Sequence, residues 1–326
     1  MRPKRLLLAV LLAAAAVPGN IWHEPEPPRD FRRLVAIEPL EVERSISGSF
    51  ELVAAWEMSG DRVQFGGLSA LVALDDTRFL AGTDGGRKLV FERPDRSKLP
   101  GVLSEIGKDD PAAKFGRDLE SLAIDPATGT VWAGYEYRGS ILRLDAELAP
   151  DKEVRPEAMS EWGDNAGPEA LVRLEDGRFL VIEERARSWG GDSHNALVFA
   201  GDPVAGGDPE EMLVRLPQGY RPVDATPLGN GRALVLLRRV DWGFPPLFQT
   251  AIAEIDVDRR EEGGAIGARL LTEFGAAIPQ DNYEGLAITE DADGTHVWLI
   301  SDDNFMSFQR TLLLKLRWQA REKARE

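Results

Sequence analysis

Short apolar strands and turn-forming residues alternate along most of this chain in a repeating order. Each repeat opens with an apolar strand, passes a turn containing Asp, Gly or Asn, and enters a second strand, as at residues 297–300. Gly and Asn tolerate positive φ angles, so this order is typical of β-hairpins. The repeats begin at Phe65, Asp118, Gly167, Val223 and Asn282.

A third and a fourth strand extend most of these hairpins. Third strands are predicted at residues 88–91, 141–144, 196–199, 251–255 and 311–316. Fourth strands fit residues 102–106, 212–216 and 270–274. The last repeat has no fourth strand of its own, and residues 50–56 are placed to complete it.

Four strands at a period of 49 to 59 residues are typical of a β-propeller, in which each blade packs against its neighbours. We therefore predict an all-β fold. It is a β-propeller of five or six four-stranded blades, with the ring closed by pairing an N-terminal strand with the C-terminal blade. Residues 34–42 are the candidate for part of a sixth blade. A β-sandwich is the alternative, but sandwiches do not repeat at a fixed period.

The N-terminus has the pattern of an export signal. Arg2, Lys4 and Arg5 precede an apolar stretch at residues 6–17, which is too short to span a bilayer. We expect a signal peptide at 1–19, an arm at 20–48, a single propeller domain at 49–318 and a charged tail at 319–326. The protein is then periplasmic or secreted, with no membrane span in the mature chain. Retention by an uncleaved signal is the alternative.

Charge and cysteine content narrow the range of partners. The formal net charge is −16, and an acidic surface repels phosphate backbones, so we expect no nucleic acid partner. An acidic surface suits divalent cations. The chain has no Cys, which excludes disulfides and leaves stability to the core.

Polar residues recur at two positions of the hairpins. The start of a hairpin's first strand and the end of its second lie at the same sheet edge, so these residues should gather at one mouth of the channel. The first position holds Ser69, Glu120, Glu169, Asp224 and Glu284. The second holds Asp84, Glu136, Glu183, Glu184, Arg238, Arg239, Asp302 and Asp303. Gathered carboxylates suit Ca²⁺, although acids that cap blade edges through backbone N–H groups are the alternative.

Arginines and two other residue types add candidate chemistry near this mouth. Arg138, Arg185 and Arg310 follow the second position and are suited to binding phosphate or carboxylate, or to pairing with neighbouring acids. His194 is either an acid/base residue or a surface-loop histidine. Trp189, like Trp242, lies in a long hairpin connection and would either line a binding mouth or cover the rim.

Several segments together resemble a known family. They lie at residues 282–287, 299–305 and 309–314, with weaker likeness at 66–69, 118–120 and 167–171. This set resembles the phytase-like propellers described as having "esterase-like activity of phytase". The resemblance implies a propeller, export to the periplasm, and a metal-dependent ester or phosphoester hydrolase.

Two functions remain open. In the first, Ca²⁺ or another divalent cation is held by some of Glu120, Glu169, Glu284 and Asp303. Glu184 or Glu136 then acts as general base, while Arg138, Arg185 and Arg310 orient a small anionic substrate. The second is a non-catalytic periplasmic propeller that binds a protein, a glycan or a small anionic ligand. The oligomeric state is left open.

Overall fold

β-Strands make up nearly all of the regular structure in the described part of the chain. The computed structural model describes residues 34–61, 64–106, 118–163, 166–241, 247–306 and 309–319. Besides strands it contains two single-turn 3₁₀ helices, η2 (Glu157–Met159) and η3 (Pro203–Ala205). The all-β prediction is confirmed. The predicted signal peptide, and all of the C-terminal tail except Gln319, lie outside the described residues.

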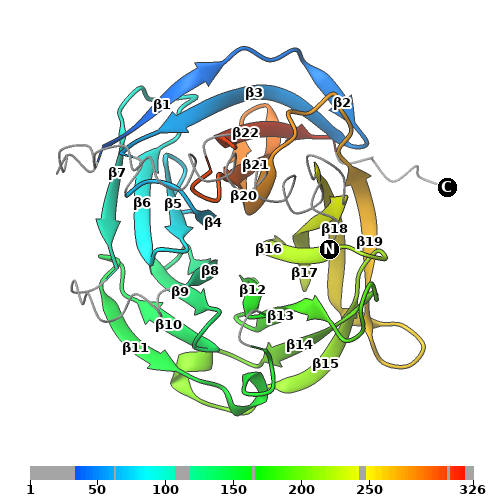
Figure 1. Ribbon diagram of the computed structural model, residues 1–326. Coiled ribbons are helices and arrows are strands. Elements are labelled where there is room, and N and C mark those ends of the chain that lie inside the picture. Colours follow the sequence, from blue (N-terminus) through cyan, green and yellow to red (C-terminus); the bar gives the residue numbers. More distant parts are fainter. Residues whose placement is uncertain are drawn as a thin grey trace, which may run out of the picture. The chain divides into compact units, whose positions relative to one another are not determined.

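Five hairpins form the inner part of this propeller-like unit (Figure 1). Their first strands β4, β8, β12, β16 and β20 contact one another in that order, and β20 contacts β4. The hairpins are β4 (Leu68–Ala73) with β5 (Arg78–Thr83), β8 (Leu119–Asp125) with β9 (Thr130–Tyr135), β12 (Pro168–Arg173) with β13 (Phe179–Ala186), β16 (Arg221–Gly229) with β17 (Arg232–Asp241), and β20 (Asn282–Asp291) with β21 (Gly294–Asp302).

Outer strands continue each hairpin away from the centre. They are β6 (Arg87–Glu92), β7 (Gly101–Glu105), β10 (Ser140–Leu144), β11 (Pro150–Val154), β14 (Ser193–Phe199), β15 (Glu210–Arg215), β18 (Leu247–Arg260), β19 (Ile266–Glu273) and β22 (Thr311–Trp318). The sequence pattern missed β11, because its residues PDKEV are largely exposed and show no apolar alternation.

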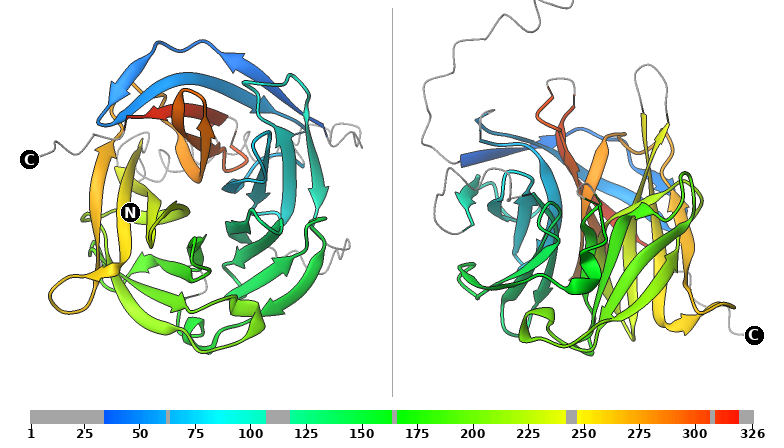
Figure 2. Two further views of the ribbon diagram at one scale, coloured as in Figure 1. Left: turned by 180° about the vertical axis from the view of Figure 1, so that it is seen from behind. Right: turned by 60° about the horizontal axis from the view of Figure 1, so that its bottom comes forward.

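The N-terminal strand β3 (Phe50–Ser59) lies beside β22, as the view from behind shows (Figure 2). The two strands pair antiparallel, from Met58 with Thr311 to Phe50 with Trp318. Segments from opposite ends of the chain therefore share one sheet.

Two further connections join neighbouring sheets at their outer strands. β1 (Leu34–Leu40) pairs with β3 on one side and with β7 on the other, and β2 (Ser45–Ser47) also pairs with β3. β15 pairs in parallel with β19. The prediction of an arm at 20–48 is therefore wrong for its second half, because the backbone of β1 is hydrogen-bonded on both sides.

The hydrophobic core fills the spaces between adjacent sheets. Trp298 in β21 is fully buried, with its ring centroid 5.6 Å from that of Trp56 and 5.0 Å from that of Phe79. These aromatic residues come from three different hairpins or outer strands, so one ring packs several segments together. Trp132 in β9 is also buried.

One buried carboxylate links three of the inner strands. Asp224 in β16 accepts hydrogen bonds from the backbone N–H groups of Leu71 (3.3 Å), Leu286 (2.7 Å) and Ala225 (2.8 Å). Burial raises the pKa of Asp224 well above its ordinary value, while the three N–H groups lower it. Asp224 therefore has the structural capping role that was the alternative to metal binding.

The regular structure of the described residues consists of strands and two short 3₁₀ helices. No helix there is long and apolar enough to cross a bilayer.

Replacing Asp224 with Ala should lower the free energy of unfolding by about 3 kcal/mol or more, because each buried N–H left unpaired costs about 1–3 kcal/mol. Asp224→Asn should cost less, since it keeps an acceptor oxygen. Chemical denaturation measures both, with Asp208→Ala at an exposed position as control. A loss no larger than that of the control would contradict this role.

Candidate functional site

An extra residue interrupts each of the five inner strands at the same place. In the first hairpin Leu68 pairs with Thr83 and Ala70 with Gly82, which leaves Ser69 between them. Such a β-bulge bends the strand and changes the direction of a side chain. The bulged residues in chain order are Ser69, Glu120, Glu169, Val223 and Glu284.

The bulge corrects one alignment made from the sequence. Asp224 was expected at the position of Glu120 and Glu169, but Pro222 pairs with Leu237 and Asp224 with Leu236. The extra residue is therefore Val223, and Asp224 occupies the next, paired position. A repeat pattern cannot show which of two adjacent residues is unpaired.

A second set of equivalent positions lies in or just after the second strand of each hairpin, one residue beyond the pair that precedes the bulge. We call the pair just before each bulge, such as Leu68 with Thr83, the bulge-flanking pair. On the second-strand side, the residues that follow this pair are, in chain order, Asp84, Glu136, Glu184, Arg238 and Asp302. Together with the bulged residues, this places seven carboxylates and one guanidinium at equivalent positions of the five hairpins. Arg238 is the only basic member of the two sets. It contacts Glu184 at 3.3 Å and pairs with Glu284.

Two groups of three carboxylates lie close together in this region. Ligand atoms of Asp118, Glu120 and Glu136 are within 4.8 Å of one another, and so are those of Glu136, Glu169 and Glu184. Glu136 belongs to both groups. We call these five residues the acidic cluster.

Crowding and burial change the protonation of the acidic cluster. Burial first, and then the charges of Asp118 and Glu184, raise the pKa of Glu136 to about 7. Burial and the neighbouring carboxylates also raise the pKa values of Glu120 and Glu169 well above the ordinary range. Without a compensating cation, these groups cannot all stay ionised at neutral pH.

Glu169 is the member that most clearly lacks a partner. It is 7% exposed, and among the described residues its carboxylate has no hydrogen bond or ion pair. A buried and unpaired carboxylate is costly unless a cation neutralises it. Carboxylate oxygens are the ligands that hard divalent cations such as Ca²⁺ prefer, so the residues present fit such an ion.

The four predicted metal ligands are not gathered in one place. Glu120 and Glu169 belong to the acidic cluster. Glu284 instead pairs with Arg238 and accepts a hydrogen bond from Asn282 Nδ2 (2.8 Å). Asp303 accepts backbone hydrogen bonds from Gly67 (3.2 Å) and Phe305 (3.0 Å).

The three predicted substrate-binding arginines are also dispersed. Arg138 pairs with Glu153 at 3.4 Å. Arg310 lies beside Asp281, whose carboxylate accepts a backbone hydrogen bond from it. Arg185 is about half exposed, 3.4 Å from Glu183, and it alone of the three lines the pocket described next.

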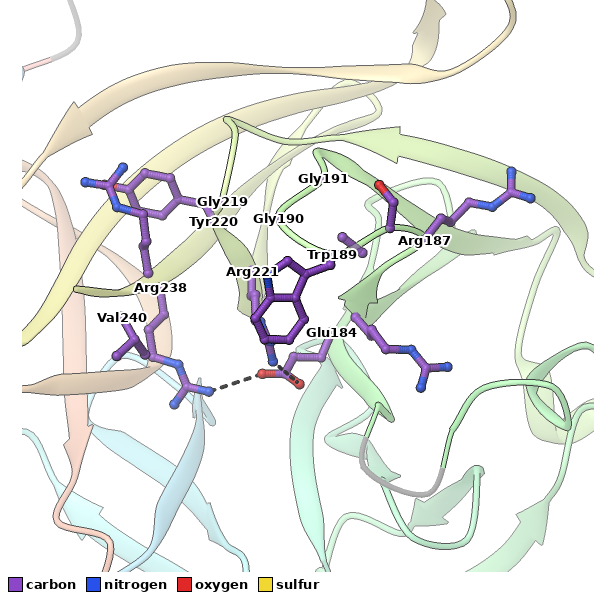
Figure 3. A pocket seen from close by; sticks show the side chains of 14 residues that line it. Glu184, Arg187, Trp189, Gly190, Gly191, Gly219, Tyr220, Arg221, Arg238 and Val240 are labelled. Carbon is purple, nitrogen blue, oxygen red and sulfur yellow. Dashed lines mark hydrogen bonds and ion pairs between the residues drawn. The ribbon is translucent and has the colours of Figure 1, made fainter. Parts of the chain in front are cut away.

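A pocket of about 660 Å³ lies between the end of β13 and the adjoining ends of β16 and β17 (Figure 3). Glu184, the one acidic residue among the described lining residues, is 3.1 Å from Arg221 and 3.3 Å from Arg238. The lining is strongly basic although the chain carries a net charge of −16, which suits an anionic ligand. We call it the arginine pocket, after Arg185, Arg187, Arg221, Arg238 and Arg239.

Sequence reasoning missed Arg221 and did not single out Asp118 as a site residue. On the first-strand side of their hairpins, both residues stand immediately before the bulge-flanking pair. The other three hairpins carry Gly67, Gly167 and Asn282 at this position. No repeated charge marks this position, so the pattern gave no signal.

The structure also places His194 and Trp189, two further candidates from the sequence. His194 was expected in a surface loop, but it lies buried in β14 with Nδ1 3.1 Å from the Glu183 carbonyl oxygen, so that expectation is wrong. Burial lowers its pKa. Trp189 lines the arginine pocket, while Trp242 lies outside the described residues.

In buffer with a chelator, Glu169→Gln should stabilise the fold, because folding then no longer has to bury a carboxylate among like charges or protonate it. We expect the melting temperature to rise by at least about 2–4 °C, the shift that 1 kcal/mol produces in a domain of this size. Scanning calorimetry measures it against Glu147→Gln at an exposed site. A lower melting temperature would contradict the unpaired state of Glu169.

Some solved structures and one family of proteins are similar to this chain. Among solved structures, similar chains include a luciferin-regenerating enzyme (14% identity, 88% of this chain and 92% of that one, TM-score 0.45). The RRP9 WD40 repeats are 11% identical (84% and 100%, TM-score 0.43), and the N-terminal domain of Nup159 is 10% identical (86% and 98%, TM-score 0.37).

A search of curated proteins finds no significant match. A sequence model of the phytase-like family, described as "esterase-like activity of phytase", matches residues 63–305, which is most of the chain. The chain therefore belongs to the phytase-like family.

Proposed function

We propose that this protein is a divalent-metal-dependent hydrolase of anionic esters, such as phosphoesters, acting at the mouth where its carboxylates gather. One observation carries the proposal: Glu184 belongs both to the acidic cluster and to the arginine pocket. A cation site and an anion-binding pocket therefore adjoin, which is the arrangement that hydrolysis of an anionic ester requires.

The cation would be held by Glu120, Glu169 and Asp118. Glu120 and Glu169 are close enough for the charge of Glu169 to raise the pKa of Glu120. Ca²⁺ is the first candidate, because all the available donors are carboxylate oxygens. When bound, the ion would polarise the ester and make a nearby water easier to deprotonate.

The protein's own residues divide the remaining tasks. Glu184 is held by Arg221 and Arg238, so it positions these arginines and is a poor general base. Glu136 has no arginine partner among the described residues and lies between the two carboxylate groups. We therefore assign proton acceptance to Glu136 and binding of the anionic group to Arg221 and Arg238.

A non-catalytic binding propeller is the second candidate. The arginine pocket supports it, because five arginines favour a small anionic ligand whether or not a cation is present. The two proposals differ in turnover: a binding protein retains the ligand unchanged.

Three finer features of the chain belong to the same proposal. We infer five blades, supported by the five hairpins, and closure of the ring by β3 against β22. β1 lies between β3 and β7 and does not start a sixth blade. We also infer export through the N-terminal signal to a periplasmic or secreted location, which N-terminal sequencing of the protein from the producing cell would test.

The wild type should hydrolyse p-nitrophenyl phosphate with Ca²⁺ or another divalent cation present and lose this activity with a chelator. Glu169→Gln should lower kcat/KM by at least about 10–100-fold, the loss already seen when residues beside metal ligands are changed. Arg221→Ala should raise KM for the phosphate ester more than for neutral p-nitrophenyl acetate. A steady-state assay measures these values.

The control for this assay is Glu147→Gln, an exposed carboxylate of the β10–β11 turn. Turnover that survives chelation undiminished would contradict metal dependence. Saturable binding of the phosphate ester without turnover, in every divalent cation tried, would favour the binding propeller.

A further inference from the structure

An exposed tryptophan stands at the edge of the arginine pocket. Trp189 is 96% exposed, the most exposed of the large hydrophobic side chains among the described residues. In Figure 3 its indole extends from the β13–β14 turn over the pocket. An indole left in water forgoes the stabilisation that burial of a large apolar side chain provides.

The turn that carries Trp189 is well defined by its backbone. The Gly191 N–H donates to the Ser188 carbonyl (2.9 Å), and the Arg187 N–H donates to the Ser193 carbonyl (2.8 Å). Gly190 has a φ of 66°, and a Cβ at Gly191 would lie 2.4 Å from Ser188 Oγ. Gly190 therefore suits this backbone conformation, and a side chain at residue 191 would crowd Ser188.

Tyr220, the other described aromatic residue that lines the pocket, already has partners within the protein. Tyr220 is 2% exposed, its hydroxyl donates to Glu273 (2.6 Å), and the Arg239 guanidinium lies 4.6 Å from its ring centroid. Trp189 makes no ring or cation contact with the described residues. Of the two aromatic rings that line the pocket among the described residues, the indole of Trp189 is the one with a face free to contact a ligand.

A free cation accompanies this free aromatic face. The side chain of Arg187, two residues from Trp189, has no hydrogen bond or ion pair within the part of the chain that the structure describes. Arg221 is half exposed, and Glu184 is the partner of its guanidinium among the described residues. The pocket thus offers guanidinium groups for an anion and an indole for a flat ring.

From these contacts we infer the substrate class: the arginine pocket takes an anionic ester that carries an aromatic ring, with Trp189 stacked on the ring and the arginines on the anion. That the ligand is an ester rests on the proposed function. A cavity of about 660 Å³ has room for a ring together with its anionic group. Arg and aromatic side chains bind such ligands through ion pairs and offset stacking.

The test compares two phosphonates that cannot be hydrolysed as esters, phenylphosphonate and methylphosphonate, by calorimetry in the presence of a chelator. Stacking on an aromatic ring is worth about 0.5–1.5 kcal/mol, which converts to a preference of roughly 2–10-fold for the phenyl compound. Trp189→Ala should abolish this preference, and Trp189→Phe should retain most of it. Arg221→Ala should weaken both ligands to the same extent.

Ile46→Ala in β2 is the control, since it removes an exposed apolar side chain that does not line the pocket. Equal binding of the two phosphonates by the wild type would overturn the inference. So would no binding of either, or a phenyl preference unchanged in Trp189→Ala. Because metal is absent, a protein that keeps the preference but never turns over an ester would overturn the proposed hydrolase alone.

Discussion

The β-bulge in each inner strand is the constraint on which the rest of the site depends. It adds one residue at the same place in all five hairpins, so the fold must direct five side chains toward one mouth. Three of them are glutamates, and the positions after the bulge-flanking pair on the second-strand side add four more acids. The concentration of negative charge is therefore a consequence of the repeated backbone geometry.

Arg238 determines which of these carboxylates are paired with a positive charge. It pairs with Glu184 and Glu284, so the carboxylates on its side are neutralised within the protein, whereas Glu120, Glu136 and Glu169 are left to crowd one another. Such a group lowers stability in the absence of a cation, which is the usual cost of a preorganised site. The same arginine lines the adjoining pocket, and so it connects cation binding with anion binding.

The sequence predicted the hairpins well, because turn chemistry and apolar strands are local properties, and it also predicted the pairing of residues 50–56 with the last repeat. It failed where long-range pairing decides: β11 has no apolar pattern, and no local pattern shows that β1, within the candidate segment 34–42, pairs with both β3 and β7. Within the site, Glu120 and Glu169 both belong to the acidic cluster, each in a group with Glu136. The separation of Glu284 follows from its contact with Arg238, which periodicity cannot show.

Calcium titration by calorimetry, of the wild type and of Glu169→Gln, tests the central claim most directly. The account predicts saturable binding by the wild type that disappears in Glu169→Gln and persists in Glu147→Gln. Absence of binding in the wild type, for Ca²⁺ and for other divalent cations, would contradict it. Binding that Glu169→Gln leaves unchanged would equally place the cation elsewhere and leave the acidic cluster without its proposed role.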